Sequence, residues 1–132
     1  MVAAPDEEGF YPIPLNLDEE ILILDTPALF REVVEDYRRG AGVDQVAARF
    51  HNSLVRLLAA ACDAVRARTG LTVAALSGGV LQNALIFTKL RRSLEELGFE
   101  VLYHTQAPPN DGGLSLGQVA VAAARLLRQS GE

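Results

Sequence analysis

The sequence predicts one α/β domain in which several helices cover a small sheet. Apolar residues recur at three- and four-residue intervals over 44–69, which is the period of a helix face. Two short apolar runs, 71–76 and 99–103, alternate with helical stretches, as strands do in α/β folds. With 132 residues, 49% of them hydrophobic, the chain is long enough to bury a single core.

The first forty residues predict an extended lead-in, a short strand and a helix. Gly9, Pro12 and Pro14 favour an irregular segment over 7–17, and 20–24 reads as a short strand. Asp25 then supplies a capping side chain and Pro27 a first-turn proline, so a helix is expected from there to about residue 39. A glycine at 40 ends it.

The long helix over 44–69 is the most regular feature of the chain, and Gly70 is placed to terminate it. Residues 71–76 follow as an apolar run without alternation, which predicts a strand covered on both faces. The apolar residues of the helix face are Ala47, Phe50, Leu54, Leu57, Leu58, Ala61 and Val65.

The second half predicts a turn at 77–79, a helix ended by Gly98, a strand over 99–103, a loop over 105–113, and a helix from Leu114 to about Gln129. This order indicates a parallel strand pair joined by a right-handed crossover. A sheet with so few strands and so many helices is expected to be part of a larger sheet. The helix before Gly98 is marked by Leu81, Leu85, Leu90, Leu94 and Leu97.

Composition and charge exclude several classes of partner. The net charge is −5 and no basic stripe follows a helix face, so we expect no direct nucleic-acid contact. We expect no secretory signal, because the first residues show no basic region followed by an apolar stretch. The longest apolar run, 114–127, is too short and too interrupted to span a membrane. Cys62 is the only cysteine, which fits a cytoplasmic protein with an inert core thiol.

Ligands of open α/β sheets gather beyond the carboxyl ends of the strands, so the turns after the two strands are the candidate sites. After the first strand, Gly78 and Gly79 would let a ligand approach the backbone closely, with Ser77 and Asn83 beside it. The alternative is that the glycines only permit a tight connection and that Asn83 is an ordinary exposed residue. The segment matches neither a Walker A loop nor the three-glycine dinucleotide motif.

After the second strand, Asp111 lies in a loop stiffened by Pro108 and Pro109, directly before the last helix. This carboxylate could bind a metal, or it could act as a turn residue or helix cap. His51 and His104 are far apart in the sequence and make no metal motif by themselves. His51 is expected to be a hydrogen-bonded structural side chain, and His104 lies near the candidate site with nothing else to support it.

Three blocks together resemble the C-terminal end of the HypF carbamoyltransferases, over roughly residues 20 to 128. They are 48–52 (Ala-Arg-Phe-His-Asn), 76–83 (Leu-Ser-Gly-Gly-Val-Leu-Gln-Asn) and 108–113 (Pro-Pro-Asn-Asp-Gly-Gly) with Gly117 and Gln118. The second block is also similar to the threonylcarbamoyladenosine enzymes and the antibiotic O-carbamoyltransferases. The third block favours HypF.

The resemblance implies the C-terminal lobe of an actin-like (ribonuclease-H-like) ATPase domain. It further implies a reaction in which carbamoyl phosphate and ATP give carbamoyl adenylate, whose carbamoyl group passes to the C-terminal cysteine of HypE during nickel–iron hydrogenase maturation. Ser77, Gly78, Gly79 and Asn83 would then contact ATP or carbamoyl adenylate, and Asp111 would bind a divalent metal, iron or zinc. The alternatives are a non-catalytic nucleotide-binding module or an O-carbamoyltransferase of the same fold.

One departure from the family is informative. The paired metal histidines, His-x-x-x-His, belong to the family's first lobe and are absent from this sequence. We therefore expect a fragment or split-gene product, with a lead-in at 1–19 and the lobe at 20–132, that is inactive alone. Its expected partners are the missing N-terminal lobe, a HypE-like acceptor protein and, through an exposed apolar face, other copies of itself.

Overall fold

The computed structural model describes residues 4, 6–16 and 23–130, and it shows an α/β fold that is mostly helical. Strands β3 (Val73–Leu76) and β4 (Glu100–Tyr103) pair parallel, as predicted. Strands β1 (Leu15–Asn16) and β2 (Ile23–Leu24) pair antiparallel, so the segment expected to be irregular over 7–17 ends in a short strand. The helices are α1 (Thr26–Arg38), α2 (Val43–Thr69), α3 (Ala84–Glu96) and α4 (Leu114–Ser130). Short 3-10 turns precede α3 at Gly79–Gln82 and α4 at Asp111–Gly113.

The predicted helix ends are confirmed by their capping contacts. Asp25 caps α1 by accepting a hydrogen bond from the Ala28 amide at 3.0 Å. Gly70 ends α2 in the left-handed conformation, with φ of 73°. One boundary differs: the predicted helix that included Leu81 begins only at Ala84, because a 3-10 turn and the cap at Asn83 come first.

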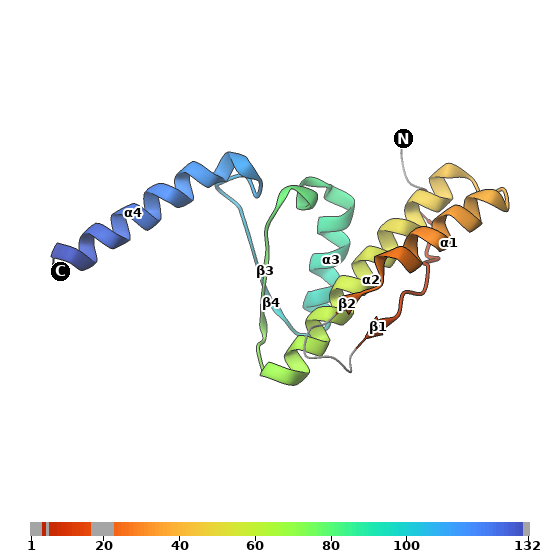
Figure 1. Ribbon diagram of the computed structural model, residues 1–132, viewed down its shortest axis with the longest axis horizontal. Coiled ribbons are helices and arrows are strands. Elements are labelled where there is room, and N and C mark those ends of the chain that lie inside the picture. Colours follow the sequence, from red (N-terminus) through yellow and green to blue (C-terminus); the bar gives the residue numbers. More distant parts are fainter. Residues whose placement is uncertain (1–3, 5, 17–22, 131–132) are drawn as a thin grey trace.

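The core lies between α2, α3 and one face of the β3–β4 pair (Figure 1). Val55 and Ala59 from α2 meet Leu90 and Leu94 from α3, and Leu94 is fully buried. Cys62 packs against this cluster, and burial raises the pKa of its thiol, as expected for an unreactive core cysteine. The regular apolar face of α2 therefore has the packing role that its periodicity predicts.

The strand pair is covered on one face only, so the prediction of a strand buried on both faces is wrong for β3 within the described structure. Ala74 and Leu76 point toward α2 and α3, whereas Val73 is 49% exposed on the other face. On β4, Val101 packs on the core and Leu102 is 50% exposed. No helix among the described residues covers the outer face, although Val73, Ala75 and Leu102 on it are apolar; Glu100, opposite Val73, is its charged residue.

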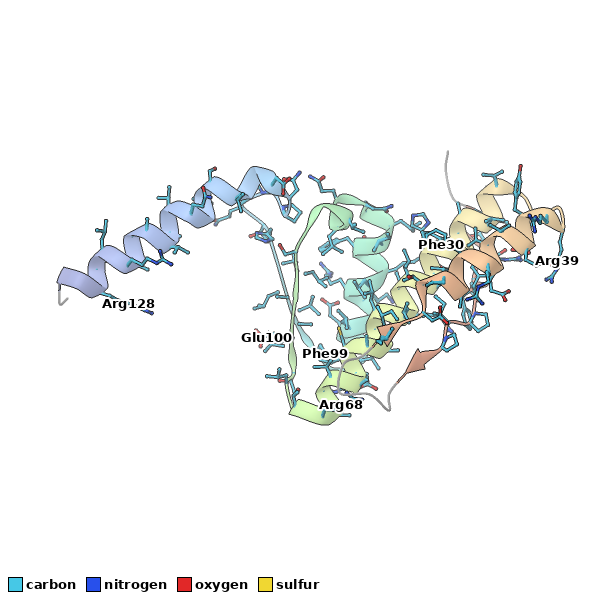
Figure 2. All side chains as sticks on the ribbon, viewed as in Figure 1. Phe30, Arg39, Arg68, Phe99, Glu100 and Arg128 are labelled. Carbon is cyan, nitrogen blue, oxygen red and sulfur yellow. The ribbon has the colours of Figure 1, made fainter. Side chains whose placement is uncertain are left out.

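Helix α4 extends away from the rest of the molecule (Figure 1), and its side chains project into open space along its length (Figure 2). Every α4 residue whose exposure is described, 114–128, is exposed. Its large apolar residues include Leu114, Leu116, Val119 and Val121, each more than half exposed. Among the described residues, no helix is long and apolar enough to cross a membrane.

The lead-in is tied to α2 by side chains of that helix. Asn52 Nδ2 donates to the carbonyl oxygens of Glu7 and Gly9 at 2.8 and 2.9 Å, and Ser53 Oγ accepts from the Tyr11 amide at 2.7 Å. These contacts order residues that form no helix or strand of their own. The expected boundary between a lead-in and a lobe, at 19 and 20, lies outside the described residues.

Candidate functional site

Two loops meet where the parallel strands end. In the strand register Leu76 is opposite Tyr103, so Ser77 and His104 leave the sheet side by side. Ser77 Oγ and His104 Nε2 are 3.0 Å apart, within hydrogen-bonding distance. One residue on, the Gly78 amide donates to the Pro109 carbonyl at 2.7 Å. The glycine loop (77–79) and the proline loop (108–113) are therefore joined directly.

Glycine occupies positions 78 and 79 of the glycine loop for different structural reasons. Gly78 has φ of 109°, a conformation that residues with a Cβ avoid. Gly79 has no such requirement, and a Cβ added there would meet only Asn110 Cβ, at 4.0 Å. Backbone geometry thus demands glycine at 78, whereas at 79 its effect is to leave space beside the proline loop.

The proline loop is held by Asn110 rather than by Asp111. Asn110 Oδ1 accepts from the Gly112 amide at 3.0 Å, and its carbonyl accepts from the Gly113 amide at 2.9 Å. A Cβ at Gly113 would lie 2.6 Å from the Pro108 carbonyl oxygen, so the chain doubles back closely there. Asn110, and not Asp111, thus caps the 3-10 turn that leads into α4.

Asp111 is exposed, and no donor among the described residues reaches its carboxylate. It lines a pocket of about 730 Å³ between the two loops and α4, together with Ser77, Gly78 and Gly79. The strand ends thus bring four of the five predicted site residues together. The pocket is lined by Ser77, Gly78, Gly79, His104, Pro108, Pro109, Asn110, Asp111, Gly113, Leu114, Gly117, Gln118, Val121, Ala122 and Arg125.

Asn83, the fifth predicted residue, does not line this pocket. Its Oδ1 accepts from the amides of Leu85 and Ile86 at 3.0 and 3.3 Å, which makes it the N-cap of α3. Its Nδ2 lies 3.1 Å from His51 Nε2. His51 is the hydrogen-bonded side chain that the sequence predicts, and its partner is a candidate site residue.

Sequence reasoning left His104 unsupported and gave Asn110 no role, yet both line the pocket. The signal for His104 was its place directly after the second strand. Parallel pairing of the two strands then sets His104 beside Ser77. No three His, Cys, Asp or Glu side chains gather as a metal cluster within the described part of the chain. Asp111 can supply one oxygen ligand there, and a complete metal site would need ligands from elsewhere.

Comparison with known proteins gives a consistent assignment. Residues 1–118 match the family described as carbamoyltransferase, Kae1-like domain, second subdomain. The carbamoyltransferase HypF of Synechocystis is 32% identical over 112 residues, which is 85% of this chain and 14% of the relative. HypF of Rhodobacter capsulatus is 39% identical over 87 residues, covering 66% of this chain and 12% of the relative. The chain thus spans about one seventh of the length of the Synechocystis relative.

Solved structures show the same arrangement. A crystal structure of full-length HypF in a phosphate- and nucleotide-bound form superposes with a TM-score of 0.86 and 34% identity, covering 95% of this chain and 16% of that chain. HypF of T. kodakarensis superposes with a TM-score of 0.75 and 24% identity, over 92% of this chain and 15% of that chain, which supports the fold.

Proposed function

The chain belongs to the HypF carbamoyltransferase family, and on that premise we propose that it forms one side of a carbamoyl-transfer active site. In the proposed reaction, carbamoyl phosphate and ATP give carbamoyl adenylate, and the carbamoyl group passes to the C-terminal cysteine of a HypE-like acceptor protein. The chain is proposed to be the C-terminal lobe of an actin-like domain, with the nucleotide lying between this lobe and a first lobe.

The observation that carries the proposal is the pocket itself. It lies beyond the carboxyl ends of two parallel strands, where α/β folds bind their ligands. Its walls combine open glycine backbone, a serine hydroxyl and a carboxylate without an internal partner. A phosphate-bearing ligand suits the first two groups, and the nucleotide-bound HypF structure has the same fold.

In this proposal Gly79 leaves the space that a phosphate occupies, and Ser77 donates to a phosphate oxygen. The Gly78–Pro109 hydrogen bond keeps the two loops together, so that Asp111 stays beside the ligand. Asn83 does not line the pocket in this proposal. It affects the position of the glycine loop from the far end of the 3-10 turn that begins at Gly79.

Asp111 is the residue of this chain that we propose as a ligand of a divalent cation, iron or zinc. A carboxylate on an exposed, proline-stiffened loop can bind such an ion without losing an internal hydrogen bond. The ion would neutralise phosphate charge and orient the acyl group. The remaining ligands are proposed to come from the first lobe.

The experiment that tests the proposal replaces Gly79 by valine in the complete enzyme, where this segment is joined to the upstream domains. The backbone at Gly79 accepts a side chain, so Gly79→Val is expected to fold with a nearly unchanged melting temperature. Its side chain would occupy the part of the pocket beside the glycine loop and weaken ATP binding at least tenfold, as measured by calorimetry.

Val80→Ala is the matched control, because Val80 is the next residue, is 68% exposed and does not line the pocket. It is expected to bind ATP normally. A second arm uses Asp111→Asn, which keeps the shape and removes the charge, and which should lower metal content and carbamoyl transfer together. Unchanged ATP affinity in a folded Gly79→Val enzyme would remove the glycine loop from the site.

A further inference from the structure

The side chain of His51 lies outside the pocket but contacts the segment that shapes it. His51 is a half-buried residue of α2, and its Nδ1 is 2.6 Å from the carbonyl oxygen of Ala47, one turn earlier. A carbonyl can only accept, so Nδ1 carries a proton. The Phe50 ring meets the imidazole edge to face, with centroids 6.0 Å apart. These two contacts set both the tautomer and the tilt of the ring.

The remaining ring nitrogen faces Asn83. His51 Nε2 is 3.1 Å from Asn83 Nδ2, and the amide nitrogen can only donate, so Nε2 accepts with its lone pair. The Asn83 Oδ1 atom already accepts from two backbone amides of α3. A flipped amide would place oxygen against the Nε2 lone pair and NH₂ against those two N–H groups. The amide of Asn83 therefore has one satisfactory orientation, which His51 and the two backbone amides favour together.

Asn83 is also the backbone junction between the 3-10 turn Gly79–Gln82 and α3. Its amide donates to the Val80 carbonyl at 3.1 Å, and its carbonyl accepts from the Phe87 amide at 3.0 Å. At the other end of the same segment, the Gly78 amide is bonded to Pro109. The segment 78–83 is thus held at one end by the proline loop and at the other end by His51.

We propose that His51 is a positioning residue for the glycine loop: by fixing the Asn83 side chain, it sets where Gly78 and Gly79 lie against the bound nucleotide. This inference rests on the proposed function of the pocket. The core does not depend on the contact, because α2 and α3 are already packed through Val55, Ala59, Leu90 and Leu94. Losing the contact should therefore alter the position of the loop more than the stability of the fold.

The test compares His51→Leu and His51→Gln in the complete enzyme, with ATP as the probe. Leucine keeps the bulk and removes both ring nitrogens, whereas glutamine restores an acceptor oxygen for the Asn83 amide. His51→Leu is expected to weaken ATP binding about fivefold, the factor that one ordinary hydrogen bond contributes. His51→Gln is expected to regain most of that affinity. The double variant, His51→Leu with Asn83→Ala, should bind ATP no more weakly than the single variant Asn83→Ala, because the two side chains act as a unit.

A purely structural role predicts a different result. The melting temperature would then fall in both His51 variants while ATP affinity stayed normal, or glutamine would fail to restore affinity, and either result would overturn the inference. Gly79→Val, measured in parallel, separates the two proposals. If it weakens ATP binding and His51→Leu does not, His51 has no positioning role and the pocket stands. If neither variant changes affinity, the proposed function fails and this inference fails with it.

Discussion

The two sides of the β3–β4 pair are built from similar residues but differ completely in what covers them. On the inner side, Leu90 and Leu94 of α3 are at most 3% exposed against α2 and the strands. On the outer side, Val73 and Leu102 are about half exposed, and the apolar residues of α4 are more exposed still. The inner side is a packed core, whereas the outer side carries apolar residues beside Glu100 and has no second layer among the described residues.

The pocket lies at the border between these two sides. Its glycine and proline loops belong to the packed part, and its other wall is the exposed helix α4. Relatives are several times longer than this chain, and full-length HypF superposes on 95% of it. We therefore propose that the outer side docks against the first lobe, which would complete both the apolar layer and the site. In the absence of the first lobe, we expect other copies of the chain to compete for this surface.

The largest expected effect is on activity, and it tests the outer side. The isolated chain should neither hydrolyse ATP nor transfer carbamoyl groups, because one wall of the site and the other metal ligands would be missing. Adding the separately expressed upstream segment to the wild-type chain should give measurable metal-dependent turnover. The same segment mixed with an Asp111→Asn chain should give none. Metal-dependent transfer by the wild-type chain alone, absent from the Asp111→Asn chain purified in parallel, would contradict the half-site proposal.

The next effect compares one leucine from each side. Leu94→Ala removes a fully buried side chain and should lower the free energy of unfolding by about 3 kcal/mol. Leu116→Ala, at a position 61% exposed on α4, is the matched control and should cost less than about 0.5 kcal/mol. Urea unfolding of the chain followed by circular dichroism measures both. Equal costs would mean that α4 is already packed in the isolated chain, which would remove the contrast between the sides.

The smallest expected effect concerns the ionic and hydrogen-bonding contacts of Asp36. Asp36 accepts from Tyr11 Oη at 2.7 Å and pairs with Arg49 at 2.8 Å, and these bonds hold the pKa of its carboxyl below the usual range. A carboxyl with a lowered folded-state pKa stabilises the fold above its unfolded pKa, about 3.9, and loses that contribution as the pH falls through the folded value.

Asp36→Asn should therefore lower the melting temperature by a few degrees at pH 7 and make it less sensitive to acid below about pH 4. Glu35→Gln, at an exposed neighbour whose partner Arg39 is also exposed, is the control and should change neither quantity appreciably. An acid transition with the same slope in Asp36→Asn and the wild-type chain would show that this carboxyl has no linkage to folding.

Local signals in the sequence were sufficient for most of the elements. The spacing of apolar residues predicted α2, and the capping residue Asp25 and the glycines at 70 and 98 predicted where helices begin or end. These features act within a few residues of chain, so the sequence displays them directly. The same holds for the loops after the strands. Their glycines and prolines pointed to the site residues, and four of the five predicted ones share the pocket.

Other features depend on residues far apart in the chain. Parallel pairing set Ser77 beside His104, and the packing of α2 on α3 set His51 against Asn83, 32 residues away. Asparagine commonly caps helices, so the residue type allowed this role at Asn83 and Asn110. Whether each took it depended on the direction of backbone amides two or three residues further along. The uniform apolar run of β3 predicted cover on both faces, and the described structure supplies it on one.

The sequence by itself thus determined the elements, their order and the loops that form the pocket, because hydrophobic period and turn chemistry are local. Only the tertiary structure decided which polar groups hold those loops, and that one apolar face is left open. The Gly78–Pro109 and His51–Asn83 contacts and the open face depend on distances between segments that are remote in the chain.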